Sequence, residues 1–341
     1  MRTLPAMTPK ERFLRALNRE HVDRIPVGNP VSVATVESME ACGAYFPDVH
    51  LNPEKMATLA ATGYEILGFD TIAPYFSVQQ EAAAFGLKMN WGTVDSMPDV
   101  LENPFEDPDD IIIPADFLER PPIRTVLEAL KILKKEYGDH VCLVGKVMGP
   151  WTLSYHLHGV QKFLIKTILE PDKVRRFLDK LKDLAVKFAN AQFAAGADVV
   201  TVADHATGDL VSGTCYRDFL LPIHQEMTRQ LNGPTILHIC GNTTDRLDYI
   251  AQAGFNCFHF DSKVNPRQAH EIVNGRIALT GSINNPKTLF NGTPDDVRRE
   301  VFANCEAGIE IISPECAVPL RTPNANLKAI VTAVEEYCRN H

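Results

Sequence analysis

The chain has no long apolar run, since no stretch approaches the roughly 18 unbroken apolar residues of a membrane span. Its first residues, MRTLPAMTPKERF, lack the apolar core of a secretory signal peptide. Positive charge is also scarce: 34 Lys and Arg against 43 Asp and Glu leave a net charge of -9. Nucleic-acid binding needs clustered basic residues to meet the phosphates. We therefore predict a cytoplasmic protein that binds neither membrane nor nucleic acid.

Paired cysteines of the form CxxC are absent, although the chain has eight cysteines. Eight cysteines in 341 residues are too dilute for a disulfide scaffold. We expect Cys142, Cys257 and Cys305 to be buried thiols that pack as small hydrophobic side chains.

Short apolar runs alternate with helical patterns over most of the chain. The runs are LGFDTIAPY, HVCLVGKV, ADVVTVAD, PTILHIC, NCFHFD, RIALTGSI and IEIISP. This alternation predicts βαβ units and a parallel sheet. No GxGxxG follows the first run, which favours an α/β fold of the (β/α)8 TIM-type barrel class over a Rossmann sheet.

Helical patterns complete this prediction. Thr8, Pro9 and Glu11 form a capping-box pattern that predicts a first helix. A long helical pattern extends from about residue 160 to 195. We predict an N-terminal helical extension over residues 1–65 and a barrel over residues 66–341.

His238 and Cys240 stand two residues apart at the end of the run PTILHIC. Side chains alternate along a strand, so both point the same way. Barrel active sites lie at the C-terminal ends of the strands, and Cys316 also follows an apolar run, so it could meet them there. One imidazole and two thiolates form a three-ligand zinc set with an open position. The alternative is a buried histidine with two structural cysteines.

Other polar residues also stand near strand ends. Asp204 and His205 follow VVTVA and are candidate substrate contacts or supports of a metal site; the alternative is a helix N-cap and a loop histidine. Lys146 could face an anionic group or lie on the rim. Asn242 is a candidate to orient His238.

Several segments resemble the methylcobamide:coenzyme M methyltransferases, a family within the uroporphyrinogen decarboxylase superfamily. These segments are TPKERFLRALNREHVDRIPV, VESMEACGAYFPDVHLNPEKMATLA, GADVVTVAD, TILHICGN and NGTPDDV. The resemblance covers nearly the whole chain. It implies a TIM barrel that binds zinc through His238, Cys240 and Cys316, with these three residues at the catalytic centre.

The resemblance implies that a thiol such as coenzyme M takes the methyl group of a methylated corrinoid. The chain has no D-x-H-x-x-G motif, so the corrinoid is expected on a separate partner protein. A second function on the same barrel moves a methyl group from a methoxy-aromatic donor to Co(I). Glu315, Trp151 and the pair Tyr75 and Phe76 would suit such a neutral donor.

Two further functions are less expected. Uroporphyrinogen decarboxylases have an arginine-rich motif after RIPV, where this chain has GNPVSVATVE, and an aspartate where this chain has Val78. A corrinoid- or metal-binding chaperone is a non-catalytic alternative.

The turn that carries the second cysteine departs from the family pattern. Coenzyme M enzymes of the family usually place this cysteine between glycines, whereas here it stands in Pro314-Glu315-Cys316-Ala317. Glu315 could ligate the metal, contact the substrate or repel a sulfonate.

Overall fold

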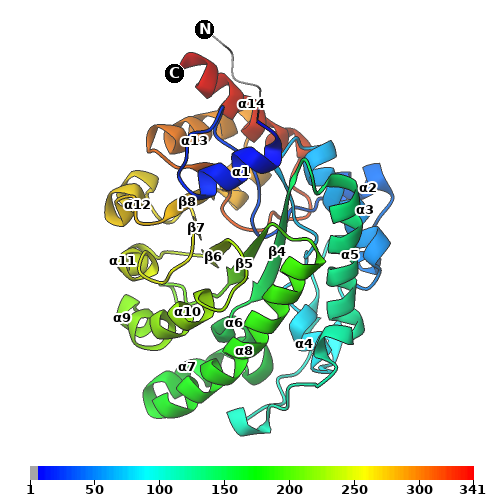
Figure 1. Ribbon diagram of the computed structural model, residues 1–341, viewed down its shortest axis with the longest axis vertical. Coiled ribbons are helices and arrows are strands. Elements are labelled where there is room, and N and C mark those ends of the chain that lie inside the picture. The colour runs from blue at the N-terminus through cyan, green and yellow to red at the C-terminus, as the bar shows by residue number, and fades with distance from the viewer. Residues whose placement is uncertain (1–6) are drawn as a thin grey trace.

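The computed structural model describes residues 7–341, which adopt the predicted TIM-type (β/α) fold (Figure 1). Seven parallel strands form one curved sheet in the order β1-β4-β5-β6-β7-β8-β9. The strands are β1 Thr71–Ile72, β4 Cys142–Met148, β5 Val199–Ala203, β6 Thr235–Ile239, β7 Cys257–Phe260, β8 Ala278–Ile283 and β9 Ile311–Pro314. A small antiparallel pair, β2 Met89–Asn90 and β3 Asp99–Val100, lies in the connection between β1 and β4.

Residues 26–28 fill the place between the two outer strands of the sheet. Val27 forms a parallel bridge with Ile312 of β9, and its carbonyl accepts a hydrogen bond of 2.6 Å from the backbone N–H of Asp70 beside β1. The ring of backbone hydrogen bonds is thereby closed without an eighth regular strand. The division of the chain at residue 65 stays a prediction, although Val27 belongs to the wall of the barrel.

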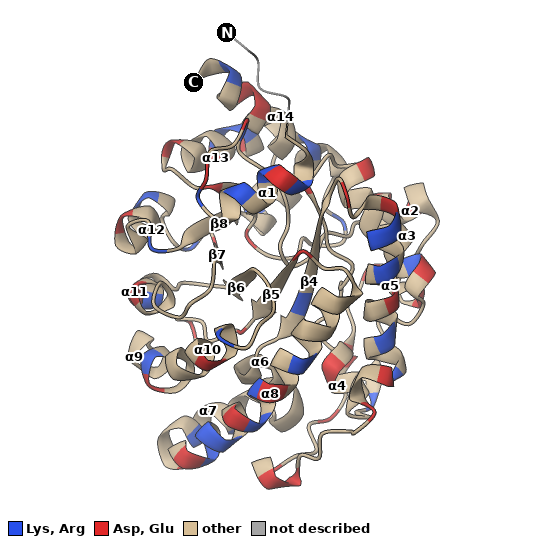
Figure 2. Cartoon of the chain, in the orientation of Figure 1, with Lys and Arg blue, Asp and Glu red and all other residues tan. Residues whose placement is uncertain are grey.

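Helices surround the sheet. They are α1 Pro9–Leu17, α2 Val36–Cys42, α3 Pro53–Glu65, α4 Gln80–Ala84, α5 Pro121–Tyr137, α6 Pro150–His158, α7 Val160–Leu169, α8 Pro171–Ala195, α9 Gly213–Cys215, α10 Leu221–Thr228, α11 Leu247–Ile250, α12 Pro266–Val273, α13 Pro294–Glu306 and α14 Asn324–Asn340. None of these helices is long and apolar enough to span a membrane. Figure 2 shows that charged residues lie mainly on the helices, whereas the strands carry few.

The first helix begins as predicted, because the side chain of Thr8 accepts a hydrogen bond from the backbone N–H of Glu11. The helical pattern expected from residue 160 to 195 forms two helices. It is divided into α7 and α8 at Glu170, since Pro171 has no N–H to continue the hydrogen-bond ladder and is instead the first residue of α8.

The interior of the barrel is apolar at the N-terminal ends of the strands. Helix α1 covers this end through contacts with β1, β4, β8 and β9. Its Phe13 and Leu17 pack with inward-facing residues of the strands, which are Cys142, Val144, Val199, Ile236, Cys257, Ala278 and Ile311. Cys142 and Cys257 are therefore core thiols, as predicted, and Cys305 is buried on α13.

The interior becomes polar one step further along each strand. The inward positions two residues on are Lys146, Thr201, His238, His259, Thr280 and Ser313, all of them buried. Side-chain alternation places this polar layer directly above the apolar one. Functional chemistry is thus confined to the C-terminal end of the barrel.

A buried carboxylate fastens the closing segment and α1 to the sheet. Asp70, which is 1% exposed, accepts hydrogen bonds from Arg12 at 2.7 Å, from Arg24 at 2.9 Å and from the backbone N–H of Val27 at 2.8 Å. Two guanidinium groups and one backbone donor surround it. Asp70 therefore links the N-terminal residues to the start of β1.

Candidate active site

Three predicted ligands meet at the C-terminal end of the barrel. His238 is the fourth residue of β6, Cys240 follows that strand directly, and Cys316 follows β9. The Nε2 of His238 lies 3.1 Å from the Sγ of Cys240 and 3.4 Å from the Sγ of Cys316. The two sulfur atoms are 3.2 Å apart. A nitrogen and two sulfurs thus form a nearly equilateral triangle, although 76 residues separate the cysteines.

The imidazole of His238 is oriented so that its Nε2 faces the two sulfur atoms. Its Nδ1 lies 3.3 Å from the carbonyl oxygen of His259, so Nδ1–H donates and Nε2 keeps its lone pair. Burial lowers the pKa of His238 well below its ordinary value, and the neighbouring ring of His259 adds to this effect. The neutral imidazole is the form that binds a metal ion.

The triangle fits a tetrahedral metal ion. Zn–S bonds of about 2.3 Å and Zn–N bonds of about 2.0 Å separate zinc ligands by roughly 3.5–3.8 Å. The observed separations of 3.1–3.4 Å need to open by only a few tenths of an ångström on average. Three ligands leave one tetrahedral position for a substrate.

The two cysteines form an electrostatically linked pair. The hydrogen bond from Cys240 to Cys316 lowers the pKa of Cys316 and raises the pKa of Cys240. The positive charge of Lys146 also lowers the pKa of Cys316, while Asp261 opposes it. Cys316 is therefore the sulfur that loses its proton first, and a bound cation would favour the thiolate form of both cysteines.

His259 contacts both His238 and the end of β9, beside Cys316, and was not among the residues predicted from the sequence. It lies beside His238 in the register of β6 and β7, and the two rings are 4.4 Å apart. Its Nε2 donates to the carbonyl oxygen of Pro314 at 2.8 Å, on the turn that carries Cys316. Alternation in the run CFHF, with a histidine on the inward face, is the sequence signal that points to it.

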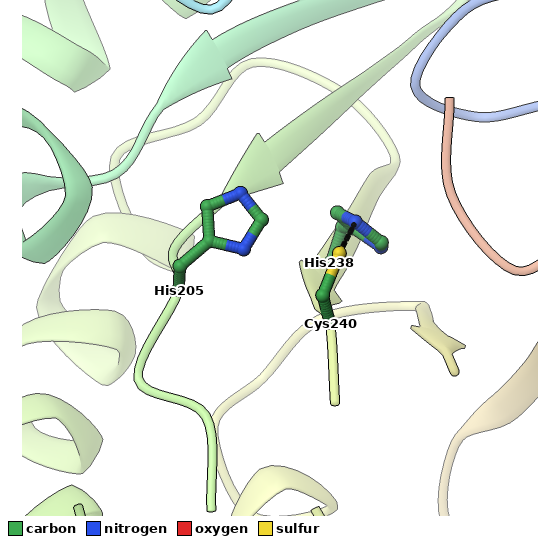
Figure 3. Close-up of side chains that lie close together, drawn as sticks. All are labelled: His205, His238 and Cys240. Carbon is green, nitrogen blue, oxygen red and sulfur yellow. Dashed lines mark hydrogen bonds between the residues drawn. The ribbon is translucent and has the colours of Figure 1, made fainter. Parts of the chain in front are cut away.

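Asp204 and His205 differ in where they point. The carboxylate of Asp204 lies 3.0 Å from the Nε2 of His224 and accepts a hydrogen bond of 2.8 Å from the backbone N–H of Thr152 on α6. Asp204 thus fastens the ends of β5 and α6. His205 instead faces the predicted metal ligands: one of its nitrogens lies within 4.8 Å of a ring nitrogen of His238 and the sulfur of Cys240 (Figure 3).

Lys146 lies inside the barrel beside Tyr75. Its ammonium group is 4.6 Å from the centre of the Tyr75 ring. The Tyr75 hydroxyl donates to Glu81, and the other oxygen of Glu81 accepts a hydrogen bond from the backbone N–H of Met148 at 2.8 Å. Burial lowers the pKa of Lys146 to about 8, so most of the ammonium stays charged at pH 7.

Glu315 and Asn242 hold loops. The two oxygens of Glu315 accept hydrogen bonds from the backbone N–H groups of Ser262 at 3.1 Å and Asn285 at 2.8 Å. The Glu315 carboxylate thus joins the loops after β7 and β8. Asn242 is exposed and accepts a hydrogen bond from the N–H of Thr244, while His238 is oriented by the carbonyl of His259.

Comparisons with known proteins agree with this geometry. The family model for uroporphyrinogen decarboxylase (URO-D) matches residues 8–337. A methylcobamide:CoM methyltransferase of Methanosarcina barkeri is 35% identical over 333 residues, covering 97% of this chain and 98% of the relative. A methylated-thiol–coenzyme M methyltransferase of Methanosarcina mazei is 33% identical, covering 97% and 90%.

A solved structure described as a methyltransferase from Methanosarcina mazei superposes with a TM-score of 0.94 at 35% identity, covering 97% of this chain and 99% of that one. This chain belongs to the uroporphyrinogen decarboxylase family and, with its methylcobamide:CoM methyltransferase relatives, is an enzyme of the methyltransferase type.

Proposed function

We propose that this enzyme transfers a methyl group from a methylated corrinoid, carried by a partner protein, to the sulfur of a small thiol. The observation that carries the proposal is the triangle of His238, Cys240 and Cys316, whose three ligand atoms lie 3.1–3.4 Å apart at the mouth of the barrel. Relatives described as acting on methylcobamide and coenzyme M support the same reaction.

The reaction needs a thiolate close to the methyl group. Zinc held by His238, Cys240 and Cys316 would lower the pKa of a substrate thiol at its fourth position. The deprotonated sulfur attacks the methyl carbon and forms the C–S bond. The Co–C bond breaks and leaves its electron pair on cobalt, so methyl-Co(III) becomes Co(I) and the thiol becomes a thioether.

The residues of this chain would position the proposed metal ligands and surround the bound reactants. The carbonyl of His259 keeps the Nε2 of His238 free, and the hydrogen bond from His259 to Pro314 holds the turn of Cys316. His205 borders the same space and would contact the bound thiol or its methyl donor. The apolar layer below the site keeps water from entering through the barrel.

Transfer from a methoxy-aromatic donor to Co(I) remains the second candidate, but side-chain contacts count against it. Trp151 is fully buried on α6, where its ring packs against Tyr155 and Phe163. Both oxygens of Glu315 are used by backbone donors. Two of the features that favoured an aromatic donor therefore serve the packing of the protein.

The experiment follows the loss of methyl-cobalt absorbance from methylcobalamin under anaerobic conditions with a panel of thiols. We expect thiol-dependent loss with the zinc-loaded enzyme. Cys316→Ala should reduce it to the rate without enzyme and should lower the zinc content. Cys305→Ala, which removes a buried thiol from α13, is the matched control and should retain both.

The proposal would be overturned if the methyl-cobalt absorbance is not lost with any thiol although the protein contains zinc. The same protein would then be tested for methylation of Co(I) by methoxy-aromatic compounds, which is the second candidate. Full activity of Cys316→Ala would remove the metal triangle from the reaction.

A further inference from the structure

A patch of exposed apolar side chains lies on α7 and on the loop that follows β5 (Figure 1). Ile165, Ile168 and Leu169 belong to α7, and Leu210 belongs to the loop. Each of these residues is between 48% and 81% exposed. Ile165, Ile168 and Leu210 line one surface groove, so helix and loop form a single surface, which we call the α7 patch. Clustered apolar side chains on a protein surface commonly mark a contact with another molecule.

Packing of α7 against the barrel does not account for this patch. Phe163 is the buried residue of the helix, and its ring packs against Trp151 and Phe177. A surface helix ordinarily turns its apolar side chains toward the core and its polar ones toward water. Helix α7 instead leaves Ile168 81% exposed and Leu169 72% exposed. These side chains therefore contribute nothing to the core and are available to a partner.

The charges of α7 are already compensated within the chain. Both lysines of the helix are paired, Lys162 with Glu106 and Lys166 with Glu170. The helix carries no acidic residue. A partner therefore finds little unpaired charge on this helix, and recognition of the α7 patch depends on apolar contact. The matching surface of the partner is apolar as well.

The α7 patch is joined to the metal triangle through the loop after β5. This loop carries both Leu210 and His205, which faces the predicted ligands (Figure 3). The N–H of Gly208 donates a hydrogen bond of 2.9 Å to the carbonyl of Asn242, two residues after Cys240. A Cβ at residue 208 would lie 2.2 Å from that carbonyl oxygen, so a glycine is needed for the two loops to lie this close. A molecule bound to the patch therefore lies beside the mouth of the barrel.

The size of the α7 patch favours a transient partner over a second copy of this chain. A stable interface of standard size takes about 20–30 residues from each partner. The patch supplies four exposed aliphatic residues, which suits a complex that forms and separates in every reaction cycle. Because α1 closes the N-terminal end of the barrel, a partner protein has to approach the site at the end where the patch lies. The corrinoid carrier required by the proposed reaction meets both conditions.

We infer that the α7 patch docks the protein that carries the methylated corrinoid, through an apolar surface on that protein. This inference rests on the proposed methyl transfer and names the surface that recognises the partner. Docking at this patch brings the corrinoid over the C-terminal ends of β5 and β6, where His205 and the metal triangle lie. Ile168 and Leu210 are the central contacts, because one lies on the helix and the other on the loop that leads to the site.

The experiment compares two methyl donors at a saturating concentration of the best acceptor in the thiol panel. One donor is free methylcobalamin, which needs no docking surface. The other is the methylated form of each D-x-H-x-x-G corrinoid protein encoded in the source genome. Ile168→Glu and Leu210→Glu should each lower kcat/KM for the corrinoid protein by roughly 10- to 30-fold, the effect of losing a central contact of an interface. Both variants should keep the wild-type kcat/KM for free methylcobalamin.

Two further variants separate apolar docking from other effects. Ile112 is 80% exposed and lies in the connection between β1 and β4, outside the α7 patch. Ile112→Glu therefore adds the same charge at a matched exposed position and should leave both donors unaffected. Ile168→Gln removes the apolar contact without adding charge and should also lower kcat/KM for the corrinoid protein. The rate with free methylcobalamin shows that each variant is folded, and Ile168→Gln replaces Ile168→Glu if the latter does not fold.

Four results would overturn the inference while thiol methylation itself stands. In the first, both patch variants use the corrinoid protein as well as the wild type does. In the second, Ile112→Glu loses as much as they do. In the third, the wild type accepts methyl groups from free methylcobalamin but from no corrinoid protein of the panel. In the fourth, sedimentation shows a dimer of the wild type and a monomer of Ile168→Glu, which assigns the patch to a second copy of the chain.

Failure of the proposed function gives a different result. The wild type then transfers no methyl group to any thiol from free methylcobalamin. Calorimetric titration of the same corrinoid proteins into wild type and Ile168→Glu tests the α7 patch without turnover. Equal affinities of the two would reject the docking surface.

Discussion

At the scale of single residues, His259 contacts both strands that carry the proposed metal ligands. His238 and Cys240 belong to β6, whereas Cys316 lies on a turn after β9, and no backbone pairing joins these two strands. His259 lies on β7, with its ring 4.4 Å from the ring of His238 and its Nε2 donating to Pro314. One side chain thus contacts both His238 and the end of β9, beside Cys316.

Replacement of His259 by Leu should weaken zinc binding by about 10- to 100-fold, the usual effect of losing a residue that supports metal ligands. Competition with a chromophoric chelator measures this affinity. Thr280→Val, a change in the same polar layer, is the matched control. Equal affinities of His259→Leu and wild type would show that the turn of Cys316 holds its own position.

The sequence predicted some of the site residues, but it did not predict where the side chains of all of them point. Alternation along PTILHIC puts His238 and Cys240 on one face, and the barrel brings Cys316 to them. Glu315 and Asn242 lie in loops, where no periodicity fixes the direction of a side chain. Only the folded chain shows that the Glu315 oxygens are taken up by backbone donors.

At the scale of elements, the closure of the barrel depends on residues that are not a regular strand. Residues 26–28 join β9 to β1 through a bridge and a few backbone hydrogen bonds. Asp70 strengthens this closure, because it binds the backbone N–H of Val27 together with the guanidinium groups of Arg12 and Arg24.

Asp70→Asn should lower the free energy of unfolding by about 3 kcal/mol, because Arg24 then loses its carboxylate partner and Arg12 keeps only Asp23. Urea denaturation followed by circular dichroism measures this change. Asp248→Asn, which removes an exposed partner of Arg276, should cost about 0.5 kcal/mol. Similar losses for both variants would show that Asp70 adds no more than a surface ion pair.

The alternation of apolar runs and helical patterns was sufficient to predict a TIM-type fold, because each run is a buried strand of a parallel sheet. It did not predict the closing segment. RIPVG is short, and Pro26 cannot donate to a strand ladder, so this segment has no strand signal of its own.

At the scale of the whole molecule, α1 closes one end of the barrel. Phe13 and Leu17 fill the space among the N-terminal ends of the strands, and the apolar layer above them has no polar opening. The metal triangle and Lys146 lie beyond that layer, near the opposite end. Every reactant must therefore approach the site from the C-terminal ends of the strands.

This geometry predicts a compulsory order of addition. A small thiol has to enter before a carrier protein covers the mouth, since no second entrance exists within the described barrel. Initial-rate measurements with a methyl-corrinoid protein should show substrate inhibition at high carrier concentration, relieved by more thiol. Free methylcobalamin, which is much smaller, should inhibit less. Simple saturation by the carrier protein at every thiol concentration would contradict this order.

In the proposed reaction, closure of the far end of the barrel by α1 would thus influence the kinetics. If thiol and carrier protein must use the same entrance one after the other, the rate of methyl transfer would depend on the ratio of their concentrations as well as on each concentration. A surplus of methylated carrier would slow its own demethylation, and the flux of methyl groups would follow the supply of thiol.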